Sequence, residues 1–283
     1  EEIERLVGLM AGLGARRVRL TGGEPTLRKN LPTLVASLRA IPGIDELAMT
    51  SNAHLLPSMA APLAAAGLSS VNVSLDTLGE HSFAQLTVKG TIQRVIRGID
   101  ACLEAGIRVS TNAVALRGVN DKELVALCQF AWERGITPRF IEHMPMSGGE
   151  VFSASNHLGA AEIRQSISEE LGLTLRELGS THGKGPARYW QVGESDKRFG
   201  IISAMSEHFC STCNRVRISA TGQLHTCLAH DDTVDLKAAM RAGAGDSILE
   251  EMVRAALGSK RDGHEFQGSG SGGPCKHMIS IGG

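Results

Sequence analysis

A repeated alternation of helix-like and strand-like segments constrains the fold of this 283-residue chain more than any other feature. In each unit, apolar residues at helical spacing end at a glycine or a Pro-Gly pair, and a short apolar run follows. The first half of the chain contains five such runs, centred near residues 18, 48, 73, 110 and 140. This alternation predicts parallel βα units, arranged either as a barrel or as an open doubly wound sheet.

The pattern changes after Pro145. A further helix and several strand-like runs then precede two more helices, near 160–171, 173–177, 187–192, 199–203, 216–220, 223–226, 236–241 and 247–257. We therefore expect a barrel-like part over residues 1–145 and a C-terminal α+β extension over 146–283. Among the helix starts, we expect Asn30 to cap one helix, and Asn120 or Asp121 to cap another.

Composition excludes several classes of function. With 29 Lys plus Arg against 30 Asp plus Glu, the net charge is -1, which argues against binding nucleic acid by phosphate neutralisation. Only 2 Trp, 1 Tyr and 7 Phe are available to stack on bases. The longest apolar stretch, 59–68, is interrupted by Pro62 and is far shorter than the roughly 20 residues that span a bilayer. We expect a cytoplasmic protein that binds neither nucleic acid nor membrane.

Polar residues follow each of the five strands, at 21–25, 50–52, 74–76, 110–112 and 142–144. Ligands of parallel α/β proteins collect at these carboxyl ends. In the strand 71–76, a period of two places Asn72, Ser74 and Asp76 on one face. After the first strand, Gly22 and Gly23 would let a ligand approach the backbone, and Glu24 supplies a charge. The alternative is that these residues are only caps and turns.

Three cysteines have a spacing suited to metal ligation: Cys210, Cys213 and Cys227 form Cys-x2-Cys-x13-Cys. They could hold an iron–sulfur cluster, or a structural zinc with a histidine as fourth ligand, and the spacing does not decide between the two. The candidate histidines are His208, His225 and His230. We expect Cys102 and Cys128 to be core residues, and Cys275 has no evident partner.

Two arginines just past the cysteines, Arg215 and Arg217, alternate along an expected strand and so point the same way. Together with Arg19, which precedes the Gly-Gly turn, they could clamp a phosphate group. The alternative for any one arginine is a solvated surface position.

Taken together, these motifs resemble the GTP 3',8-cyclase family, the radical S-adenosylmethionine (SAM) enzymes of molybdenum-cofactor biosynthesis. The resemblance runs in the family's order along the whole chain. It is carried by the segments at 20–25, 50–52, 72–76, 139–144 and 209–217, and by the terminal 281–283. It implies an incomplete, open TIM-like barrel with a C-terminal extension that carries a [4Fe-4S] cluster.

The resemblance also implies roles for individual residues. Gly22, Gly23, Glu24, Ser74 and Met144 would bind SAM. Cys210, Cys213 and Cys227 would hold the C-terminal cluster, whose open iron binds guanine. The nucleotide would be held by Arg19, Thr50, Ser110, Arg215, Val216 and Arg217. The Gly282-Gly283 tail would reach into the active site. Expected partners are GTP, cyclic pyranopterin monophosphate synthase and an electron donor, with a homodimer left open.

Two departures from the family pattern matter. The family's first cluster needs a Cys-x3-Cys-x2-Cys motif after the first strand, and no such spacing occurs here. We therefore expect that the N-terminal strand and motif precede this chain, and that the chain alone is inactive. The second departure is Ser110, where the family has a nucleotide-binding lysine. Two alternatives to GTP cyclisation are a radical SAM paralogue with a different substrate, and a non-catalytic, zinc-stabilised nucleotide-binding barrel.

Overall fold

The main sheet of the computed structural model, which describes residues 1–87, 90–149, 152–180 and 185–282, has eight strands in the order β1-β2-β3-β4-β5-β8-β7-β6. β1 to β5 pair in parallel, β8 pairs in parallel with β5, and β7 and β6 continue the sheet antiparallel. The bounds are β1 (Arg17–Leu20), β2 (Glu46–Ser51), β3 (Ser70–Ser74), β4 (Arg108–Ala115), β5 (Thr137–Glu142), β6 (Leu175–Ser180), β7 (Arg188–Val192) and β8 (Arg198–Ile202).

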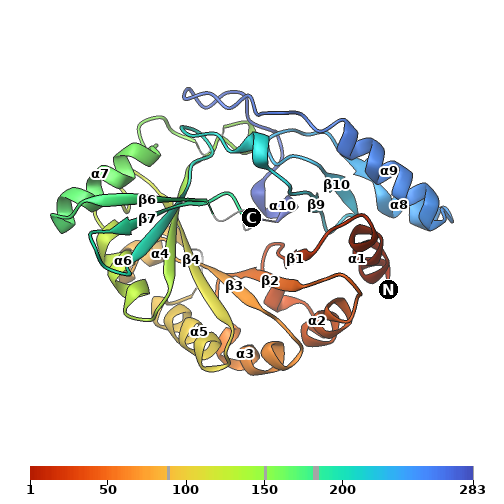
Figure 1. Ribbon diagram of the computed structural model, residues 1–283, viewed down its shortest axis with the longest axis horizontal. Coiled ribbons are helices and arrows are strands. Elements are labelled where there is room, and N and C mark those ends of the chain that lie inside the picture. The colour runs from red at the N-terminus through yellow and green to blue at the C-terminus, as the bar shows by residue number, and fades with distance from the viewer. Residues whose placement is uncertain (88–89, 150–151, 181–184, 283) are drawn as a thin grey trace.

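Helices line the outside of the curved sheet, and the C-terminal end of the chain lies near the middle of the ring (Figure 1). This arrangement confirms the expected open barrel, in which β1 and β6 form the two edges of the sheet. The helices are α1 (Glu2–Gly12), α2 (Leu31–Arg39), α3 (Leu56–Ala65), α4 (Glu80–Leu86), α5 (Ile92–Glu104), α6 (Leu124–Trp132), α7 (Ala160–Leu171), α8 (Leu236–Arg241), α9 (Asp246–Gly258) and α10 (Met278–Ile281).

The main hydrophobic core lies between the sheet and its outer helices. Alternate strand residues such as Leu47, Met49, Val71 and Val73 are fully buried there, because period two turns every second side chain outward toward the helices. Cys102 and Cys128 belong to this core, as expected, and Cys275 is exposed.

A smaller core joins the C-terminal extension to the start of the chain. In it Leu6 of α1 packs with Leu224, Leu236 and Leu249. Leu224 belongs to a small three-stranded sheet, Leu236 to α8 and Leu249 to α9. The small sheet consists of β9 (Arg217–Ile218), β10 (Gln223–His225) and β11 (Val234–Asp235). The extension therefore packs against α1, beside the β1 edge of the barrel (Figure 1).

The helix-cap predictions are met only in part: Asn30 stands at the N-terminal cap position of α2, but neither Asn120 nor Asp121 caps α6. Asn30 adopts a left-handed conformation, with φ 56°, and its side chain makes no cap bond. Helix α6 begins at Leu124, and the Asn120 side chain instead donates to the carbonyls of Asp76 and Val114. Asp121 accepts from Gly118 N within the turn. Short polar side chains satisfy nearby backbone groups in several ways, of which a helix cap is only one.

Candidate active site at the carboxyl ends of the strands

The inner face of the sheet is polar, as predicted for β3. Val71, Val73 and Leu75 are buried, whereas Asn72 and Asp76 are half-buried and Ser74 is exposed. Thr50 on β2 and Ser110 on β4 are also half-buried, and Ser110 pairs with Asn72 in register. The alternation therefore directs a row of hydrogen-bonding side chains into the barrel.

Three arginines from distant parts of the chain gather inside the barrel: Arg19 on β1, Arg139 on β5 and Arg217 on β9. Burial, and then repulsion by Arg139, lowers the pKa of Arg19 to about 10, and Arg217 contributes in the same direction. Arg19 nevertheless remains accessible to solvent, so it lies in an open interior rather than a sealed one. Like charges held this close favour binding of an anion.

Arg139 offers a donor that the protein does not use. Its Nε donates to Asn112 Oδ1 at 2.9 Å, but its Nη2 is buried without a hydrogen-bond partner, and burial lowers its pKa. Buried polar groups normally have partners, so this orphaned donor indicates a ligand. The resemblance at 139–144 does not by itself predict that Arg139 binds a ligand. The signal was its place on the inward face of the alternating strand.

The remaining expected nucleotide residues differ in their surroundings. Arg215 is exposed, and its guanidinium carbon lies 5.1 Å from the centre of the Phe209 ring. The side chain of Val216 packs against the smaller core. Burial and repulsion by Arg215 lower the pKa of Arg217, and the nearby Cys213 and Cys227 oppose this shift. Arg217 therefore interacts electrostatically both with Arg19 and with the cysteines.

The Gly-Gly turn after β1 has the open backbone that the sequence predicted. Gly22 has φ +145°, a conformation that side chains rarely permit. The carboxylate of Glu24 accepts four hydrogen bonds, from Thr26 N and Oγ1, Ser51 Oγ and Asn52 N, at 2.6–3.0 Å. These bonds tie the turn to the end of β2. Met144, the other expected SAM residue, is half-buried just after β5.

The C-terminal tail lies against this turn. A Cβ on Gly23 would stand 3.6 Å from Ile279 Cγ1, and one on Gly282 would stand 2.3 Å from Thr21 Cγ2. Arg217 donates to the carbonyl of Gly282, and Ile281 is buried. Gly283 lies outside the described residues. The tail thus brings Gly282 to both the arginine cluster and the Gly-Gly turn.

The three cysteines Cys210, Cys213 and Cys227 are half-buried and close enough to influence one another. Burial, and then Cys227 and Cys213, raises the pKa of Cys210. Burial also acts to raise the pKa of Cys213, but Arg215 and Lys260 outweigh it and the net shift is downward. Lys260 Nζ lies 3.8 Å from Cys213 Sγ. Nearby cations favour the thiolate, which is the ligating form.

Three neighbouring thiols are a donor set that iron–sulfur clusters use. Among the described residues, no three His, Cys, Asp or Glu side chains converge to hold one metal ion. The histidines considered for zinc have other neighbours: His208 meets His264, His225 meets Lys276, and His230 meets Gly263 O. In an iron–sulfur cluster each cysteine binds a different iron.

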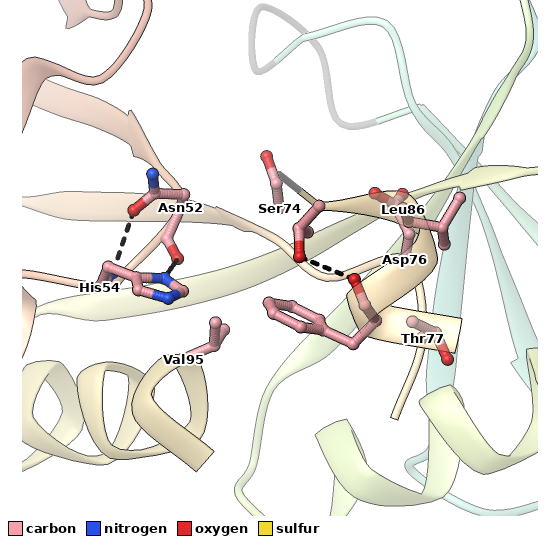
Figure 2. Close-up of a pocket in the computed structure, with 9 residues that line it drawn as sticks. Asn52, His54, Ser74, Asp76, Thr77, Leu86 and Val95 are labelled. Atoms are coloured by element: carbon pink, nitrogen blue, oxygen red, sulfur yellow. Dashed lines mark hydrogen bonds between the residues drawn. The ribbon is translucent and has the colours of Figure 1, made fainter. Parts of the chain in front are cut away.

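A pocket of about 290 Å³ opens beside the ends of β2 and β3, lined by Asn52, Ser74, Asp76 and residues of α4 and α5 (Figure 2). Burial raises the pKa of Asp76, although a bond from Val114 N at 2.7 Å opposes the shift. The pocket therefore includes Ser74, one of the residues expected to bind SAM. Helix α4, which forms one of its walls, was not predicted from the sequence.

Two family models match most of the chain. The family models described as Radical SAM superfamily and Molybdenum Cofactor Synthesis C match residues 1–131 and 136–266. The crystal structure of Streptococcus suis SuiB bound to precursor peptide SuiA is similar in fold, with a TM-score of 0.50 and 20% identity. The match covers 60% of this chain and 38% of the SuiB chain, and it supports the fold alone.

The curated relatives are more similar in sequence. The GTP 3',8-cyclase of Caulobacter vibrioides is 43% identical over all of this chain and 81% of its own length. That of Pelotomaculum thermopropionicum is 42% identical over 94% of this chain and 82% of its own length. That of Hydrogenovibrio crunogenus is 35% identical over all of this chain and 86% of its own length. With this identity along its whole length, the chain belongs to the GTP 3',8-cyclase family of radical SAM enzymes.

Proposed function

We propose that this protein converts GTP to (8S)-3',8-cyclo-7,8-dihydroguanosine 5'-triphosphate, the first step of molybdenum-cofactor biosynthesis. The observation that carries the proposal is the meeting of three features in one barrel: the arginine cluster, the Gly282 tail and the nearby cysteines. A barrel that bound only SAM would have no use for a cluster of cations in its interior. A triphosphate neutralises such a cluster.

The chain's own residues would bind and orient the reactants. Arg19, Arg139 and Arg217 would hold the triphosphate, with Thr50 and the 215–217 segment beside them. Gly22, Gly23, Glu24, Ser74 and Met144 would hold SAM at the neighbouring strand ends. Together with a reduced [4Fe-4S] cluster, SAM supplies the radical chemistry when it is bound. The protein's contribution is to position the ribose and to exclude water.

The three cysteines Cys210, Cys213 and Cys227 would hold a [4Fe-4S] cluster that leaves one iron open for guanine. We place the boundary between the barrel and this cluster-bearing part near residue 145. A second [4Fe-4S] cluster would depend on the family's N-terminal motif. The product would pass to cyclic pyranopterin monophosphate synthase, with a separate electron donor, in the cytoplasm. Analytical ultracentrifugation would establish whether the protein forms a homodimer.

The test of this function begins with the metal. After anaerobic reconstitution, the protein should contain iron and sulfide, and Cys213→Ala should lose the C-terminal cluster. Cys275→Ala is the matched control, because Cys275 is exposed and should leave the iron content unchanged. One zinc and no iron would contradict the proposal and support the zinc-stabilised barrel.

Ser110 provides a second test, which concerns the substrate. A neutral hydroxyl stands on the inward face of β4, where the family has a lysine. If GTP is the substrate, Ser110→Lys should tighten GTP binding, because it adds a cation to the nucleotide site. The full-length protein should also turn over GTP without that change. Turnover of another nucleotide in preference to GTP would support the paralogue instead.

A further inference from the structure

The short segment 274–277 connects the extension to the C-terminal tail, and Lys276 lies at its centre. Its half-buried ammonium group donates to the carbonyls of His230 and Cys227, the latter at 3.4 Å, and lies 3.3 Å from His225 Nδ1. These acceptors all belong to the stretch that contains Cys227. Lys276 therefore holds the loop that carries the third cysteine.

The other side of the same segment is fixed to the loop after β5. Ser147 N donates to the carbonyl of Lys276 at 3.3 Å, and Ser147 Oγ lies 2.6 Å from His277 Nδ1. Gly148 N donates to the carbonyl of Pro274 at 2.8 Å. Segment 274–277 is thus held between the cysteine loop and the loop that follows Met144.

Five residues beyond Lys276, the chain reaches the active site. Ile281 is buried there, and Gly282 meets Thr21 and Arg217. Helix α10 is only four residues long, so the position of Gly282 depends on where the preceding segment is held. A lysine that loses its carbonyl acceptors would no longer fix that segment, because a half-buried ammonium group must find other partners.

We propose that Lys276 is a positioning residue that couples the C-terminal cluster to the docking of the tail. When the cluster holds Cys227, the carbonyls of Cys227 and His230 stay in place, and Lys276 anchors the tail to them. Without the cluster, these acceptors move and the tail is released. The inference rests on the proposed function in one respect, the iron cluster at the three cysteines.

Hydrogen exchange at the amides of 276–282 tests the coupling, with the metal-loaded protein and its chelator-stripped form compared. In the wild type, cluster loading should slow exchange of these amides by about tenfold or more. In Lys276→Met, exchange should be fast and should no longer depend on the cluster. Lys276→Arg should restore part of the protection. Lys122→Met, at an exposed position, should behave as the wild type does.

Two results would overturn the coupling. The first is a tail in Lys276→Met that exchanges as slowly as in the wild type. The second is a wild-type tail whose exchange rate is the same with and without the cluster. If Lys276→Met also loses iron while β1 to β5 stay protected, the coupling is supported, because linkage is reciprocal. If those strands lose protection, Lys276→Met has unfolded. The test then depends on Lys276→Arg, in which part of the protection of the tail should remain. A wild type that binds no iron at all contradicts the proposed function, which the iron analysis detects separately.

Discussion

Gly200 on β8 pairs in register with Arg139 on β5, and two side chains pack closely over this glycine. A Cβ at residue 200 would stand 3.0 Å from Arg139 Cγ and 2.9 Å from Tyr189 Cε1. The absence of a side chain at Gly200 therefore lets the stem of Arg139 and the ring of Tyr189 lie across the strand. From this position Arg139 acts electrostatically on Arg19.

Gly200→Ala should disturb that packing. We expect GTP binding to weaken by about tenfold, because the Arg139 guanidinium must shift, and a tenfold change is about 1.4 kcal/mol. Overpacking of this kind also costs about 1–3 kcal/mol of unfolding free energy. Calorimetric titration with GTP and urea denaturation measure the two effects.

The control for this change is Gly8→Ala. Gly8 lies within α1 and has nothing within 4 Å of an added Cβ, so the substitution should leave GTP binding unchanged. It should also stabilise the helix by roughly 0.5–1 kcal/mol. If Gly200→Ala behaved as this control does, Arg139 would not depend on the close approach of β8.

Glu24→Ala should loosen the Gly-Gly turn. The carboxylate joins this turn to Ser51 and Asn52 at the end of β2, and its removal leaves the donors on both segments without an acceptor. We expect a loss of about 2–3 kcal/mol in unfolding free energy, and weaker SAM binding. Urea denaturation checks the stability. A loss no larger than that of Glu104→Ala, at the exposed end of α5, would contradict this role.

The repeating part of the fold could be predicted because its signals are local. Glycine stops such as Gly106 and the period-two alternation of 71–76 act within a few residues, and β1 to β5 occur where these signals indicated. The order β5-β8-β7-β6 could not be predicted, because it depends on pairing between segments that no local pattern relates. The roles assigned to individual site residues stay predictions.

Glu142 illustrates what the sequence did not reveal. It was grouped with the polar strand ends that face a ligand, but it is fully buried. Its carboxylate accepts from the backbone amides of Ala160, Met205 and Ser206 at 2.7–2.9 Å. These donors come from residues 18 to 64 positions later in the chain. A strand-end carboxylate that binds a ligand and one that organises loops look the same until the fold brings their partners together.

The free energy of unfolding should depend on pH through Asp76, and the burial of this side chain fixes the direction. Burial raises the pKa of this carboxyl group in the folded state, so the native protein binds more protons than the unfolded chain between the two pKa values. The contribution of Asp76 to stability is therefore greatest below the ordinary pKa of aspartate, about 3.9, and is lost as pH rises through the raised value.

Asp76→Asn removes this titration and keeps an oxygen to accept from Val114 N. We expect the variant to exceed the wild type in unfolding free energy at neutral pH, with the difference closing in acid. Urea denaturation across a pH series measures this, and Asp262→Asn, at an exposed site, is the control. A variant that is less stable at neutral pH would mean that the ionised carboxylate has a stabilising partner.

Gly282→Ala should release the tail from the barrel, for two reasons that can be separated. The Cβ would collide with Thr21 Cγ2, and the φ of +83° is one that alanine rarely adopts. Because a displacement of about 1 Å can cost 10²-fold in rate, we expect GTP turnover by the full-length protein to fall by about that factor, with thermal stability unchanged. Thr21→Ser removes the colliding methyl group and should be nearly neutral alone. Combined with Gly282→Ala, it should restore only part of the activity, because the backbone strain remains. If the double variant recovered full activity, the collision with Thr21 would explain the whole effect. If Gly282→Ala alone retained turnover, the tail would be passive in the reaction.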